Sequence, residues 1–149
     1  MNDDPKRELL RHMVATVLFR GRIAIANTPP DFAEFRVTPE TRSPAEILAH
    51  IGDLLVGTRV LLQGDLVELR SSPLEWNQEG QRFFAAAKEL DAFLASDTPL
   101  ALPVEKFVQG PVGDALTHVG QIVLLRRIAG APVRPEPYFT ADIVPGVSG

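Results

Sequence analysis

The stretch SPAEILAHIGDLL (residues 43–55) carries the signs of an amphipathic helix and of the fold to which that helix belongs. Ser43 can cap the helix, Pro44 suits its first turn, and Glu46, three residues after the serine, completes a capping box. The apolar residues that follow recur with the spacing of one helix face, and this pattern continues toward residue 70. We therefore predict a helix over residues 43–70.

Three further segments show the same helical spacing of apolar residues. The third predicted helix opens with Ser72-Pro-Leu-Glu75, which repeats the capping box of the second helix. The chain has no strand-like alternation of comparable length and no internal repeat. We predict an all-α fold, an up-and-down four-helix bundle in one domain (residues 1–149) with a short irregular C-terminal tail. The predicted helices cover residues 6–26, 43–70, 73–96 and 111–129.

The composition excludes several classes of protein. The 149 residues include no cysteine, which rules out disulfide bonds and thiolate ligands and favours a cytoplasmic protein. The net charge of −4 offers no general attraction for nucleic acid, so no nucleic-acid partner is expected. An apolar stretch over residues 14–26 is interrupted by Arg20 and Arg22 and is too short to cross a membrane.

Two of the three histidines of the chain fall on the apolar faces of predicted helices. His50 lies on the second helix and His118 on the fourth, and Asp114 precedes His118 by four residues, so these two side chains share a helix face. Imidazole and carboxylate groups are costly to bury without partners, and both bind divalent metals. If the two faces meet at one level, His50, Asp114 and His118 form a three-ligand metal site with open positions for water or substrate.

Each of these residues also has an ordinary structural interpretation. A histidine at the edge of an apolar face often forms a hydrogen bond to a carbonyl or an acid, and Asp114 lies in the first turn of its helix, where the helix dipole favours an acid. Asp53, one turn after His50, is interpreted as a solvated acid or as a group that supports the His50 ring. Gln121 can orient a water or a substrate oxygen, or serve a structural hydrogen bond.

The sequences EILAHIGD (residues 46–53) and DALTHVGQI (residues 114–122) resemble those of the DinB-like superfamily of metalloenzymes. The resemblance implies a helical bundle that holds nickel or zinc through one histidine of the second helix and two histidines of the fourth, spaced by four. His50 and His118 match the first and last of these ligands, whereas Asp114 occupies the place of the middle one. An oxygen ligand there shifts the preference toward harder metals, so iron is a further candidate.

The resemblance also implies the functions to be tested. We expect a homodimer that acts on a small-molecule ligand, as a metal-dependent hydrolase or a thiol-dependent transferase. The alternative is a non-enzymatic homodimeric bundle that binds partners, contains no metal and uses its histidines as ordinary interior residues. No residue of the sequence supports a role in binding damaged DNA.

Overall fold

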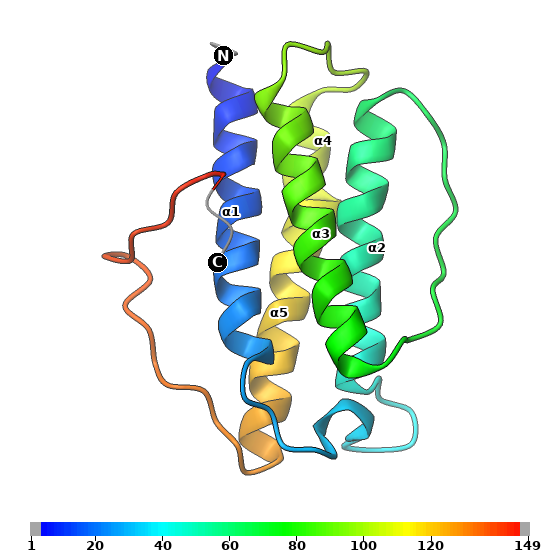
Figure 1. Cartoon of the computed structure of the whole chain (residues 1–149), viewed down its shortest axis with the longest axis vertical. Helices are drawn as coiled ribbons and strands as arrows, with labels where there is room; N and C mark the ends of the chain where they lie inside the picture. Colours follow the sequence, from blue (N-terminus) through cyan, green and yellow to red (C-terminus); the bar gives the residue numbers. More distant parts are fainter. Residues whose placement is uncertain (1–3, 147–149) are drawn as a thin grey trace.

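The computed structural model describes residues 4–146 and consists of long helices packed side by side (Figure 1). A short helix, α4 (Val104–Gln109), precedes the last long helix, and a 3-10 turn, η1 (Phe32–Glu34), lies between the first two. The part of the chain that the structure describes contains no β-strand. The predicted all-α four-helix bundle is therefore confirmed. Its long helices are α1 (Pro5–Ile25), α2 (Pro44–Leu62), α3 (Trp76–Ala95) and α5 (Pro111–Ile128).

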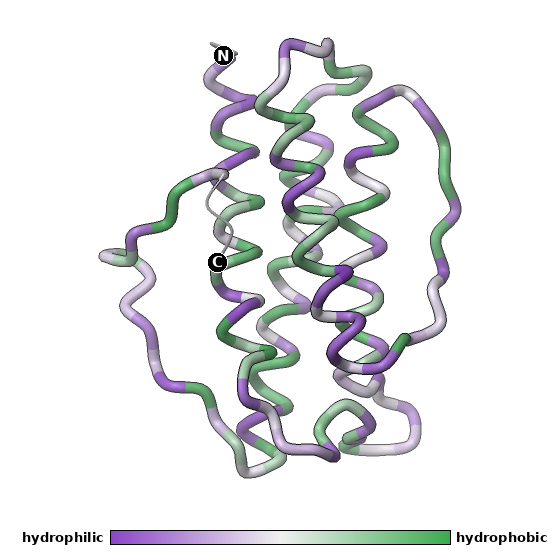
Figure 2. Tube along the Cα trace, viewed as in Figure 1, coloured by the Kyte–Doolittle hydropathy of each residue, from purple (hydrophilic) through white to green (hydrophobic). Residues whose placement is uncertain are grey.

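One core runs through the centre of the bundle. Hydrophobic and hydrophilic residues are interspersed along the helices (Figure 2), and the buried hydrophobic residues of all four long helices form one cluster. The removal of these side chains from water is the main force that holds the helices together. Within residues 4–146, no helix combines the length and the apolarity needed to cross a lipid bilayer. The largest fully buried apolar side chains include Phe32, Phe83, Phe107, Leu10, Leu48, Ile51, Leu55, Leu62, Leu90, Leu94 and Ile122.

Two buried arginines fasten the ends of neighbouring helices. Arg7 of α1 donates hydrogen bonds to three carbonyl oxygens at and just beyond the end of α3. Arg126 of α5 donates to the carbonyls of Ala24 and Ala26 at the end of α1. The last carbonyls of a helix have no partner within it, so these guanidinium groups satisfy them and also complement the negative end of the helix dipole.

The helix directions differ from the predicted up-and-down order, because α2 and α3 run parallel (Figure 1). Arg82 near the start of α3 contacts Asp53 in the first half of α2, and Arg59 near the end of α2 contacts Glu89 further along α3. Residues 63–75 form the crossover between them, and an extended chain of this length reaches roughly 40 Å. That reach exceeds the roughly 30 Å length of α2, so the connection can return along the whole bundle.

The prediction of a helix over residues 43–70 was wrong at its end, and this error accounts for the difference in direction. The helix ends at Leu62, and Gly64 adopts a left-handed conformation with a φ of 91°. The apolar residues that extended the pattern are exposed, with Leu66 at 92% of its full accessible surface. A helix to residue 70 would have left only a tight turn before α3 and would have forced the two helices antiparallel.

The predicted start of the third helix at residue 73 was also wrong. The helix α3 begins at Trp76, with Glu75 at its N-cap position and no side-chain cap. The capping box of Ser72 does not form, because the neighbouring Ser71 binds α2 through its backbone and side chain. The capping box of Ser43 and Glu46 at the start of α2 is confirmed.

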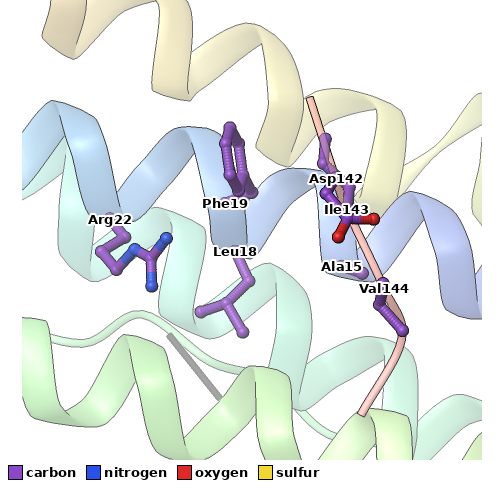
Figure 3. A pocket seen from close by; sticks show the side chains of 7 residues that line it. All are labelled: Ala15, Leu18, Phe19, Arg22, Asp142, Ile143 and Val144. Atoms are coloured by element: carbon purple, nitrogen blue, oxygen red, sulfur yellow. The ribbon is translucent and has the colours of Figure 1, made fainter. Parts of the chain in front are cut away.

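The C-terminal tail leaves the end of α5 and rises beside α1 (Figure 1). The Tyr138 ring lies under the guanidinium of Arg20, 3.9 Å from its centroid to the Cζ atom, and meets the edge of Phe19. Further on, residues 142–144 pass Ala15, Leu18, Phe19 and Arg22 of α1 (Figure 3), where they enclose a small cavity of about 80 Å³. The tail is irregular, as predicted, and it packs on the bundle. Residues 147–149 of the predicted tail lie outside the described part of the chain.

Candidate metal centre

The helices α2 and α5 bring the three predicted ligands together. His50 lies in the second turn of α2, whose start is fixed by the capping box, and Asp114 and His118 lie in consecutive turns of α5. The N and O atoms that these side chains offer to a metal all lie within 4.8 Å of one another. The two histidine rings also meet edge to face, with their centroids 4.6 Å apart. The periodicity of the sequence thus predicted a juxtaposition that the structure contains.

The separation between His50 Nε2 and Asp114 Oδ2 distinguishes two interpretations of the cluster. The two atoms are 3.4 Å apart, which is longer than the roughly 2.7–3.2 Å of a normal N–H···O hydrogen bond. Bonds of about 2.0–2.2 Å to a common ion separate two ligands of a tetrahedral site by roughly 3.3–3.6 Å. The separation is therefore compatible with two ligands of one ion and is too long for a strong hydrogen bond.

The His118 ring is held by a backbone contact at Nδ1. Its Nδ1 atom lies 2.8 Å from the backbone carbonyl oxygen of Asp114. A carbonyl oxygen only accepts hydrogen bonds, so Nδ1 carries the proton and Nε2 keeps its lone pair. A histidine that ligates through one nitrogen usually donates its other N–H in this way. The carboxylate Oδ1 of Asp114 lies 3.3 Å from the same Nδ1 and reinforces this tautomer.

The cluster lies at the edge of the core and is partly open to solvent. The exposed fractions of the side chains are 12% for His118, 32% for His50 and 46% for Asp114. His50 also lines a cleft of about 540 Å³ between the start of α2 and the crossover. An ion held by these three side chains would therefore be reachable from solvent. This openness is typical of catalytic metal sites, whereas structural sites are enclosed by protein ligands.

The two residues considered as supports of the site lie in different surroundings. Gln121 is exposed on α5, one turn after His118. Asp53 is buried, so its interpretation as a solvated acid was wrong. Its carboxylate accepts hydrogen bonds from the backbone and hydroxyl of Ser71 and forms an ion pair with Arg82. Burial raises the pKa of Asp53, but these hydrogen bonds and the positive charge outweigh it and keep the pKa below its usual value of 3.8.

Sequence reasoning missed the network to which Asp53 belongs. Arg82 also donates to the Ala49 carbonyl and contacts Glu79, and buried Glu79 accepts a hydrogen bond from the backbone of Leu74. The spacing of Glu79 and Arg82 on one face of α3 was the available signal. Their link to Asp53 depends on the parallel packing of α2 and α3, which the sequence pattern did not predict.

No known protein family, curated protein or solved structure gives a significant match to this chain. The resemblance to DinB-like proteins therefore stays a prediction. The chemical character of the site is accordingly judged from the three side chains themselves. Two imidazoles and one carboxylate are a donor set that suits zinc, nickel and ferrous iron.

Proposed function

We propose that this protein binds one divalent metal ion through His50, Asp114 and His118. With this ion the protein acts as a metal-dependent hydrolase or as a thiol-dependent transferase. The observation that carries the proposal is the convergence of these three side chains from two helices, with His50 Nε2 and Asp114 Oδ2 at the separation of two metal ligands. One N or O atom of each side chain lies within 4.8 Å of the other two, so these atoms need to approach by at most about 1.5 Å to reach the separation of tetrahedral ligands. Rotation of partly exposed side chains can supply such a movement.

The residues of the site divide the work between them. His118 is fixed through its Nδ1–H and presents Nε2, whereas His50 faces the cleft from which a small molecule can approach. Asp114 reaches both rings and supplies the negative charge that compensates a bound cation. When bound, a divalent ion with three protein ligands supplies Lewis acidity at its open coordination positions.

Zinc and nickel are the first candidates for the ion, and iron is the next. Two imidazole nitrogens favour zinc and nickel, and the carboxylate oxygen of Asp114 makes the site harder than three histidines would. Two histidines and one carboxylate with open positions are also the ligands of many non-haem ferrous enzymes. Metal content measured on the purified protein distinguishes these ions.

A specific observation also favours the alternative of a metal-free binding protein. His118 already has a partner in the Asp114 carbonyl, and the two rings pack against each other. Leu124 and Ile128 expose about half of their surface on α5 and offer an apolar face to a second copy of the chain. In this alternative the protein is a homodimeric bundle that binds partners, and the three polar residues serve its packing.

Metal analysis of tag-free protein tests the proposal against this alternative. We expect close to one equivalent of a divalent metal in the wild-type protein and in His12→Ala, whose histidine is exposed on α1. His50→Ala and His118→Ala should lower the affinity by at least about tenfold, because each removes one of three ligands. Asp114→Asn should weaken binding through loss of charge. A metal-free wild-type protein, or equal metal in all variants, would favour the binding protein.

A further inference from the structure

The cleft beside His50 contains two arginines that have no partner among the described residues. Arg42 and Arg70 both line it, and neither forms a hydrogen bond or an ion pair with any residue between positions 4 and 146. Its volume of about 540 Å³ lies in the range of pockets that hold small organic molecules. The cleft therefore combines the space for a ligand with two unused groups of hydrogen-bond donors.

The acids of the cleft do not neutralise these arginines. Glu46 forms its ion pair with Arg36, and Asp53 forms its ion pair with Arg82. Neither Arg36 nor Arg82 is among the residues that line the cleft. Both acids are thus paired with arginines outside the cleft, and the two arginines that line it have no ion-pair partner between positions 4 and 146.

The same acids also fix the backbone beside each arginine. The Glu46 carboxylate accepts a hydrogen bond from the Ser43 backbone N–H, and the Glu46 backbone N–H donates to the Ser43 hydroxyl oxygen, so the residue next to Arg42 is held in place. Asp53 binds the backbone N–H of Ser71 at 3.0 Å and its hydroxyl at 2.7 Å, next to Arg70. Because these neighbours are held, less conformational entropy is lost when the two side chains bind a ligand.

We infer that this cleft binds the carboxylate or phosphate group of a small organic substrate through Arg42 and Arg70. Guanidinium groups bind both anions with paired, charge-assisted hydrogen bonds. Because His50 lines the same cleft, a molecule held at its anionic end can also contact the proposed metal site. That the bound anion belongs to a substrate rests on the proposed function. The binding of the anion itself does not require a metal.

NMR titration of the metal-free protein tests this inference. The probes are inorganic phosphate and acetate, each compared with sodium chloride at matched ionic strength. We expect saturable shifts at the amide signals of Arg42, Arg70, Ser71 and Ser72 with at least one probe, and the stronger probe identifies the preferred anion. Arg42→Gln combined with Arg70→Gln should weaken binding at least about tenfold, because two charge-assisted contacts are lost. Arg134→Gln, another exposed arginine, should leave it unchanged.

A second pair of measurements separates this inference from the metal proposal. The double arginine variant should bind zinc with wild-type affinity, and His50→Ala should lose zinc but retain phosphate or acetate binding. A wild-type protein that binds phosphate or acetate but no zinc would overturn the proposed function and leave the anion site. The inference is overturned if neither probe shifts these signals more than sodium chloride, or if the double variant binds as tightly as the wild type.

Discussion

Two polar clusters lie one turn apart on α2, and they differ in how completely their groups are satisfied. Around Asp53, the guanidinium of Arg82 forms ion pairs with the carboxylates of Asp53 and Glu79. Arg82 and Glu79 also form hydrogen bonds with nearby backbone groups. Around His50, the groups converge at distances that leave nitrogen lone pairs available. We call the first the closed cluster (Asp53, Glu79, Arg82) and the second the open cluster (His50, Asp114, His118).

The difference separates a structural role from the role proposed for the metal site. The acids of the closed cluster expose 10% and 1% of their side chains, so their charges need the arginine between them. The members of the open cluster keep 12% to 46% of their surface in contact with water. A group that is buried and fully bonded stabilises the fold, whereas a group with spare lone pairs near solvent can bind a ligand.

The largest expected effect comes from breaking the closed cluster at its centre. Arg82→Met keeps the length of the side chain but leaves the buried carboxylates of Asp53 and Glu79 without their counter-charge. We expect the free energy of unfolding to fall by about 3 kcal/mol, measured by urea denaturation. Arg42→Met, at an exposed arginine that pairs with no residue of the described chain, should change it by less than about 0.5 kcal/mol. Equal effects of the two variants would contradict the structural role of the closed cluster.

The pH dependence of stability gives a second, smaller test of the closed cluster. The folded-state pKa of Asp53 lies below its usual value, so its contribution is present above about pH 4 and is lost as the pH falls through the folded pKa. At pH 6 the wild type should be more stable than Asp53→Asn by about 1–2 kcal/mol. Denaturation curves at lower pH should show this advantage shrinking, and an advantage that grows toward acid would refute the assignment.

Two glycines of α2 sharpen the comparison further. A β-carbon at Gly52 would lie 2.6 Å from the Arg82 guanidinium, whereas one at Gly57 would meet nothing within 4 Å. Gly57→Ala should stabilise the protein by about 0.5–1 kcal/mol through helix propensity. In Gly52→Ala the displaced guanidinium loses hydrogen bonds, and we expect a net loss of about 1 kcal/mol. If both variants raise the thermal unfolding temperature equally, the hydrogen bonds of Arg82 do not depend on the absence of a β-carbon at Gly52.

The smallest effect is expected from the open cluster in the absence of metal. His118→Ala and His50→Ala remove partly exposed rings that make few strong hydrogen bonds, so the metal-free protein should lose about 1 kcal/mol or less. Zinc at 100 times its wild-type dissociation constant should stabilise the wild type by about 2.7 kcal/mol and each variant by no more than about 1.4 kcal/mol. If the metal-free variants lose several kcal/mol in free energy of unfolding, these histidines have a structural role like that of the closed cluster.

The sequence predicted those features that depend on one helix at a time. The four long helices and the inward positions of His50 and His118 follow from periodicity, and Pro111 marks the start of α5 correctly. The end of α2 could not be predicted, because Leu66 and Leu69 continue the apolar spacing into an exposed crossover.

The closed cluster and the paired arginines of the cleft depend on how separate elements meet. Asp53 was interpreted as solvated because its partners, Ser71 and Arg82, lie on the crossover and on α3. Their approach requires the parallel packing of α2 and α3. A short sequence pattern contains no information about that packing, whereas the meeting of α2 and α5 needed only two inward faces at one level.

The central claim is that the open cluster holds one ion. A crystal structure of the protein soaked with zinc, with anomalous differences measured at the zinc edge, tests it most directly. We predict one strong peak within about 2.0–2.2 Å of His50 Nε2, an Asp114 carboxylate oxygen and His118 Nε2. An absent peak, or a peak that none of these three residues contacts, would contradict the claim and leave the two histidines as packing residues.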